Sequence, residues 1–130
     1  MPALRSIIAL VGGFAIMAFL MFALVAIAAW VIGARAGDQY SPAMLGANIG
    51  LFAIAALAGG YATASLAPGR PRLHAAVLAG MVLAMTVSTI ASPPAGAPRW
   101  FPVTLAVIGP VFAVLGGVLR RQPSSSPVPT

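Results

Sequence analysis

Few side chains in this sequence have the chemistry that catalysis or metal binding requires. Asp38 is the only acidic residue, His74 is the only histidine, and the chain contains no cysteine. An active site needs groups that exchange protons, attack a substrate or hold a metal, positioned within reach of one another. Asp38 follows the end of one long apolar run and His74 begins another, so we expect the two to lie about a bilayer apart. We therefore predict no catalytic residue, no cofactor, no metal site and no enzymatic activity.

Asn48 is the most polar side chain inside any apolar run. Counting from the nearest run ends places it level with Thr86, Ser88 and Thr89. One interpretation is structural glue, because a hydrogen bond between membrane helices contributes about 0.6–2 kcal/mol. The other is a polar lining for a permeant. No run contains Asp, Glu, Lys or Arg, so the buried charge that couples a transporter to a proton gradient is missing.

The positive charge of the chain comes entirely from arginine. The formal net charge is +6, and all seven basic residues are arginines. They lie at the ends of apolar runs, a placement that favours lipid headgroups and topology control over nucleic-acid binding. The candidate contacts to anionic lipid are Arg70, Arg72, His74, Arg120 and Arg121. The alternative is that these residues only set topology.

Four apolar runs dominate the chain. It is 61% hydrophobic and only 6% charged, whereas a soluble domain carries about 25% charged residues. About 20 apolar residues span a bilayer as a helix. The runs that meet this length cover residues 7–33, 42–67, 73–91 and 101–119. We predict an all-α transmembrane domain over residues 1–121, a four-helix bundle followed by a disordered cytoplasmic tail over residues 122–130.

The first apolar run has an alternative interpretation, and the second has a clear start signal. Residues 7–33 also resemble a signal peptide, but a signal's apolar region is only about 7–15 residues long, so we expect a retained span. Ser41 and Pro42 have the chemistry of a helix N-cap and first helical position. We therefore expect the second helix to begin at Pro42.

The charges and aromatic residues predict one orientation. Short loops on the cytoplasmic side of a membrane protein are enriched in arginine and lysine. The side with more arginine carries Arg5, Arg70, Arg72, Arg120 and Arg121, and the opposite side carries Arg35 and Arg99. Trp30, Tyr40 and Trp100 fall at this second boundary, where amphipathic rings prefer the headgroup layer. Both termini are therefore predicted to be cytoplasmic.

Glycines recur at spacings that permit close helix packing. Gly46 and Gly50 form a G-x-x-x-G pair, and Gly109, Ala113 and Gly117 follow one another at intervals of four. Counted by depth, further glycines fall in the half of the bundle that carries the arginine-rich turn. These are Gly12, Gly13, Gly59, Gly60, Gly80, Gly116 and Gly117. We expect the helices to pack most tightly there, with Gly60 and Gly80 less tolerant of leucine than Ala76.

One stretch resembles a known pattern. Gly59-Gly60-Tyr61, the basic turn through Arg72, and then Leu73-His74 and Gly80 are similar to a motif of small four-helix bacterial membrane proteins of unknown function. The resemblance implies a topology and no activity. We predict a non-enzymatic protein of a bacterial inner membrane, which contacts the lipid bilayer and acts through helix packing, as a homo-oligomer or as an accessory subunit of a larger membrane partner. The alternative is a small channel or transporter that uses the polar level at Asn48.

Overall fold

The computed structural model describes residues 2–67 and 69–120, which form four long helices joined by short connections. The helices are α1 (Pro2–Ile32), α2 (Pro42–Leu66), α3 (Pro71–Ala91) and α4 (Trp100–Leu119), with a short 3-10 turn, η1 (Asp38–Tyr40), before α2. The predicted tail over residues 122–130 lies outside the described residues.

The first helix begins earlier than its apolar run. α1 starts at Pro2, five residues before the expected start, because proline suits the first turn of a helix and arginine at position 5 is a good helix former. Its far end closes with the Gly33 backbone in the left-handed region, at φ 71°. The N–H groups of Gly33 and Ala34 donate to the carbonyls of Trp30 (3.2 Å) and Ala29 (2.9 Å). This pair of bonds is the Schellman motif, which satisfies the last carbonyls of a helix.

The starts of α2 and α3 both use proline. The hydroxyl of Ser41 accepts a hydrogen bond from the Met44 N–H at 3.4 Å, and Pro42 takes the first helical position. The predicted N-cap is therefore confirmed. α3 begins at Pro71, two residues before the expected start, because proline has no N–H to leave unpaired in the first turn.

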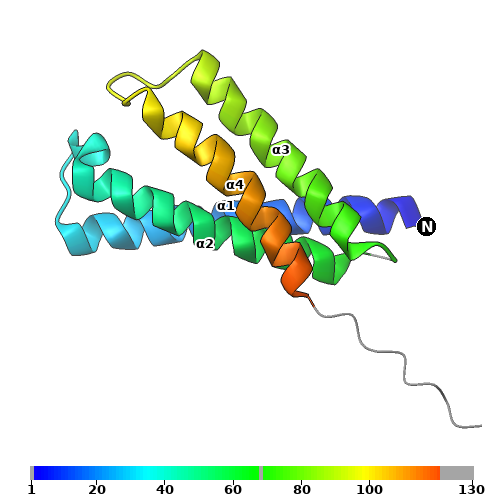
Figure 1. Ribbon diagram of the computed structural model, residues 1–130. Coiled ribbons are helices and arrows are strands. Elements are labelled where there is room, and N and C mark those ends of the chain that lie inside the picture. Colours follow the sequence, from blue (N-terminus) through cyan, green and yellow to red (C-terminus); the bar gives the residue numbers. More distant parts are fainter. Residues whose placement is uncertain (1, 68, 121–130) are drawn as a thin grey trace, which may run out of the picture.

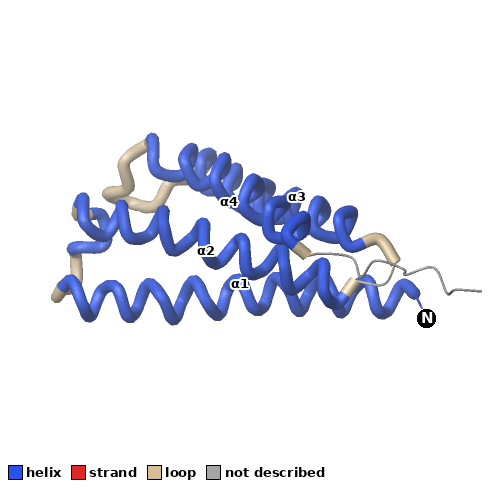
Figure 2. Tube along the Cα trace, turned by 60° about the horizontal axis from the view of Figure 1, so that its bottom comes forward, coloured by secondary structure: helices blue, strands red, loops and turns tan. Residues whose placement is uncertain are grey.

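The helices pack as two oblique pairs (Figures 1 and 2). α2 packs against α1 on one side and against α4 on the other, and α3 packs mainly against α4. α1 and α3 therefore occupy the outer sides of the bundle, and Figure 1 shows the α3–α4 pair crossing α1 and α2 at an angle. Contacts between α1 and α3 are few.

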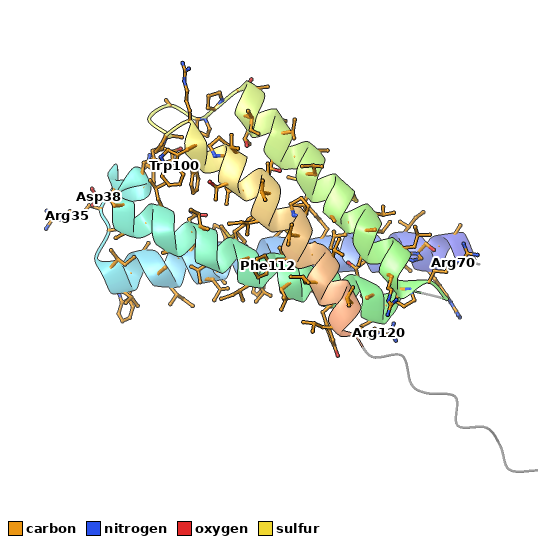
Figure 3. All side chains as sticks on the ribbon, in the orientation of Figure 1. Arg35, Asp38, Arg70, Trp100, Phe112 and Arg120 are labelled. Carbon is orange, nitrogen blue, oxygen red and sulfur yellow. The ribbon has the colours of Figure 1, made fainter. Side chains whose placement is uncertain are left out.

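The two ends of the bundle differ in chemistry. One end, called here the tryptophan end, holds the α1–α2 and α3–α4 connections together with Trp30 and Trp100. The other end, called the arginine end, holds the α2–α3 connection and the end of α4. Figure 3 shows Arg70 and Arg120 at the arginine end.

The outer surface of the helices suits lipid and not water. All four helices are long and apolar enough to cross a membrane. Phe22 is 79% exposed and Trp30 84% exposed on α1, and apolar side chains face outward on every helix. A soluble monomer does not leave contiguous apolar surface on this scale. The chain is therefore a multi-pass membrane protein whose helices contact the lipid bilayer.

Candidate functional site

An elongated groove lies between α1 and α3, and runs from near the tryptophan end to just past the middle of α1. Its volume is about 630 Å³, within the usual range for ligand pockets. We call it the lateral groove. It is lined by Phe14, Met17, Ala18, Met21, Phe22, Val25, Ala26 and Ala29 of α1, Asn48 and Phe52 of α2, Val82, Met85, Thr86 and Thr89 of α3, and Leu105 of α4. The groove exists because α1 and α3, the two outer helices, make few contacts with each other.

Three of the four predicted polar residues meet in this groove. Asn48, Thr86 and Thr89 all line it. The Thr86 hydroxyl donates to the Val82 carbonyl at 2.9 Å, and the Thr89 hydroxyl donates to the Thr86 carbonyl at 2.7 Å. Each threonine hydroxyl therefore donates its hydrogen bond to a backbone carbonyl of α3 itself.

Asn48 and Ser88 depart from the expected arrangement. The Asn48 side chain makes no hydrogen bond to any of the described residues, so the expected bond between helices is not present. Ser88 is exposed outside the groove and donates to the Met85 carbonyl at 2.6 Å. Successive helical residues are turned by about 100°, so residues at one depth do not share one face.

Seven of the ten helical glycines lie against a neighbouring helix. A Cβ on Gly13 would overlap the Thr63 hydroxyl, and one on Gly59 would lie 2.7 Å from the Met17 Cβ. These two positions set the contact between α1 and α2. Gly12, the other predicted glycine of α1, would meet Leu66 at 3.0 Å, a distance that a flexible side chain accommodates.

The contacts of α4 are made by backbone as well as side chains. A Cβ on Gly60 would overlap the carbonyl of Ala113, and one on Gly116 would overlap the carbonyl of Leu57. Gly117 lies against Ala75 of α3. On Gly109, a Cβ would come within 2.7 Å of the side chains of both Phe52 and Val82. Bulkier residues at these positions would separate α4 from its neighbours.

Three of the predicted packing glycines face away from the chain. Gly46, Gly50 and Gly80 are exposed, and a Cβ on any of them would have no neighbour within 4 Å. The expectation of tight packing at these positions is therefore wrong within the single chain. The buried face of α3 passes through Ala79, and Gly80 lies one residue further around the helix. Counting residues from the end of a helix gives the depth of Gly80 but not the direction in which it faces.

The arginine end contains a shallow hollow of about 490 Å³ between the start of α3 and the end of α4, lined by Arg70, Arg72 and Arg120 among others. Arg72 and Arg70 are exposed. The Arg120 guanidinium donates to the carbonyl of Ala64 in the last turn of α2, so this residue also caps a helix. Arg121 lies outside the described residues.

His74 has a local partner. Its Nδ1 lies 2.9 Å from the Arg70 carbonyl oxygen, one helical turn earlier. The imidazole therefore contacts the backbone at the start of α3, at the carbonyl that also accepts the His74 N–H at 3.3 Å. Asp38, at the tryptophan end, accepts a hydrogen bond from the Arg35 N–H at 2.8 Å. Figure 3 shows Asp38 and Arg70 at opposite ends of the bundle, so Asp38 and the arginine-end groups do not form one site.

Sequence reasoning missed two features of the packing. Thr63 is completely buried, and its hydroxyl has no hydrogen-bond partner among the residues that the structure describes. Arg120 is a candidate contact to anionic lipid, and nothing in the sequence indicates its bond to the Ala64 carbonyl, which joins the end of α4 to α2. Neither feature has a sequence signal, because each depends on which helix lies beside which.

The comparisons with known proteins do not supply a family. No protein-family model matches the chain, and neither a curated protein nor a solved structure matches it. Within residues 2–67 and 69–120, no group of three or more His, Cys, Asp or Glu side chains is placed to hold a metal ion. The function is therefore argued from the geometry alone.

Proposed function

We propose that this chain is a non-enzymatic protein of a bacterial inner membrane that packs its helices against another membrane-embedded chain. The partner is a second copy or a larger membrane protein to which this chain is an accessory subunit. The proposal rests on a difference between two sets of glycines. Seven helical glycines lie against a neighbouring helix of the same chain, whereas Gly46, Gly50 and Gly80 face outward, and a Cβ on any of them would have no neighbour within 4 Å.

The outward glycines belong to stripes of small residues. On α3, Ala76, Gly80, Ala84 and Ser88 follow at intervals of four, and all are exposed. On α2, Gly46 and Gly50 form an exposed pair with the same spacing. Small residues at this spacing let two helix backbones approach closely, and van der Waals packing is a main source of association between helices in lipid. The α3 stripe is the longer surface, so we assign the contact to it.

The test uses the absence of native cysteine. We expect Ala84→Cys, oxidised in native membranes, to form a disulfide-linked species, either a dimer of this chain or an adduct with a cysteine-bearing partner. Val107→Cys is the matched control, because it is also exposed but lies on α4. Equal cross-linking at both positions, or none at Ala84, would contradict the proposal.

A second substitution separates association from folding. Gly80→Leu places a bulky side chain on the α3 stripe, where nothing in the chain lies close. We expect this variant to keep its helix content and to lose association in mild detergent, measured by size-exclusion chromatography with light scattering. If Gly80→Leu unfolds the monomer, the stripe is structural and the proposed contact is wrong.

The second candidate function is a small channel or transporter. The observation that favours it is the meeting of Asn48, Thr86 and Thr89 in the lateral groove. In this candidate, a neighbouring chain would close the groove into a polar path. Asn48→Leu distinguishes the two functions, because a permeation path would lose transport while the packing function would keep its partner.

A further inference from the structure

We propose that the lateral groove binds one acyl chain of a membrane glycerolipid, with an ester carbonyl of the lipid accepting a hydrogen bond from the Asn48 amide. The site lies between α1 and α3, away from the small-residue stripe of α3. This proposal is therefore independent of the proposed function.

The polarity of the groove is unequal along its length. Asn48 lies about 9 Å from the start of α2, and Thr86 and Thr89 lie within about 8 Å of the end of α3. The deeper lining is apolar and reaches Phe14, about 27 Å along α1 from its tryptophan end. An occupant that matches this pattern has a polar group near the membrane boundary and a hydrocarbon chain pointing inward.

Asn48 identifies the polar group. Its amide lines the groove and makes no hydrogen bond to any residue that the structure describes. An unpaired amide in hydrocarbon is costly, so the occupant is expected to supply a partner. The hydroxyls of Thr86 and Thr89 already donate to carbonyls of α3, which leaves the Asn48 amide as the groove residue with an unused donor. The NH₂ of an asparagine donates to an acceptor, and the ester carbonyl of a glycerolipid is one.

The shape of the groove suits an extended chain. From Phe14 to Ala29 the groove follows about 22 Å of α1. Its volume of about 630 Å³ is therefore spread along one helix and not gathered in a round cavity. Carbon atoms in contact lie about 3.5–4.0 Å apart, so an extended hydrocarbon chain can contact the apolar side chains along this whole length.

The experiment measures lipid retention by native mass spectrometry. The full chain is reconstituted into vesicles of palmitoyl-oleoyl phosphatidylcholine and released into a mild detergent. This lipid has no net charge, so its retention does not depend on attraction between an anionic headgroup and the arginines of the arginine end. We expect one phosphatidylcholine molecule to remain bound to each wild-type chain.

Two alanine substitutions on α1 form a matched pair. Ala26→Trp fills the groove and is expected to abolish retention, whereas Ala15→Trp, exposed on the same helix but outside the groove, is expected to preserve it. Circular dichroism checks the helix content of both. If Ala26→Trp does not fold, Met85→Trp fills the groove from α3 and takes its place. Equal retention by wild type and by a folded groove-filling variant would overturn the proposal.

The hydrogen bond is tested by changing both partners. We expect Asn48→Leu to lower retention by about threefold to tenfold. A dialkyl ether phosphatidylcholine lacks the ester carbonyl, and wild type and Asn48→Leu should retain it equally. A loss of the same size with the ether lipid would contradict the assigned acceptor. A lipid-free wild-type chain, or reaction of Asn48→Cys with a membrane-impermeant thiol reagent in the vesicles, would indicate water or another occupant and would overturn the lipid site.

Discussion

The backbone of Gly60 on α2 lies directly against the carbonyl of Ala113 on α4. A Cβ at Gly60 would overlap that carbonyl oxygen, and both residues are buried. The same Cβ would lie 2.7 Å from the carbonyl carbon and 3.0 Å from the Cα of Ala113, so no side chain separates the two helices at this point. The α2–α4 contact is therefore made by two backbones, and one added methyl group is enough to disturb it.

Gly60→Ala is expected to destabilise the bundle. The new methyl group would meet backbone, which cannot rotate away, and overpacking of this kind costs about 1–3 kcal/mol. Gly80→Ala is the matched control, because a Cβ there has no neighbour within 4 Å. Its stability should stay the same or rise by up to about 1 kcal/mol, since alanine favours a helix over glycine.

The measurement for this pair is unfolding in mixed detergent micelles, followed by circular dichroism. It should be made on monomeric protein, so that association through α3 does not contribute. If the two variants lose the same stability, the α2–α4 backbone contact does not have the role assigned to it.

Sequence reasoning predicted the helices well because each span carries its own signal. Apolar runs of sufficient length, ended by glycine, proline or charge, mark the four helices. The Ser41 cap follows from local hydrogen bonding between this residue and Met44. Such features depend on residues close together in the chain, so no knowledge of packing is needed to find them.

The candidate site was predicted only in part. The depth of a residue in the membrane can be counted along its own helix, but the direction in which its side chain faces depends on how the helix is rotated against its neighbours. Asn48 and Thr86 were placed at one level and do line one groove. Ser88 has the same depth but faces away, and Gly80 lies beside the buried face of α3 and not on it. Which face of a helix is buried depends on the position of its neighbours. In a chain where every face is apolar, the sequence pattern does not mark that face.

Gly13→Ala is expected to lower stability by about 1–3 kcal/mol, because a Cβ there would overlap the Thr63 hydroxyl. Thr63→Ala removes the colliding group and should restore part of the loss in the double variant. The restoration is partial because the Gly13 Cβ would still lie 2.8 Å from the Cβ of residue 63, which alanine keeps, and 2.9 Å from the Gly59 carbonyl oxygen.

A double-mutant cycle on unfolding free energies measures this coupling. Strict additivity of Gly13→Ala and Thr63→Ala would show that the two positions do not interact. Gly12→Ala provides the control, since its Cβ would meet only the flexible side chain of Leu66, and it should show no coupling to Thr63→Ala.

Arg120→Ala is expected to lower the unfolding free energy by about 1 kcal/mol, because it removes the charged donor that caps the Ala64 carbonyl at the end of α2. Arg72→Ala removes the same charge from the same end of the bundle, but Arg72 is exposed and should change stability little. Thermal unfolding of both variants in one detergent makes the comparison. Equal losses would mean that net charge at the arginine end matters and the bond to Ala64 does not.

The arginine end of the bundle is expected to face the cytoplasm. Cytoplasmic loops are enriched in arginine and lysine, and this end carries the Arg70 turn and Arg120. Single cysteines report the orientation cleanly, because the chain has none of its own. Ala36→Cys and Ala95→Cys, both exposed at the tryptophan end, should react with a membrane-impermeant thiol reagent in intact cells whose outer membrane is permeable to it. Ala3→Cys, exposed at the start of α1, should react only after the inner membrane is opened. The reverse pattern would place the arginine end outside, and labelling at all three positions before opening would rule out a single orientation.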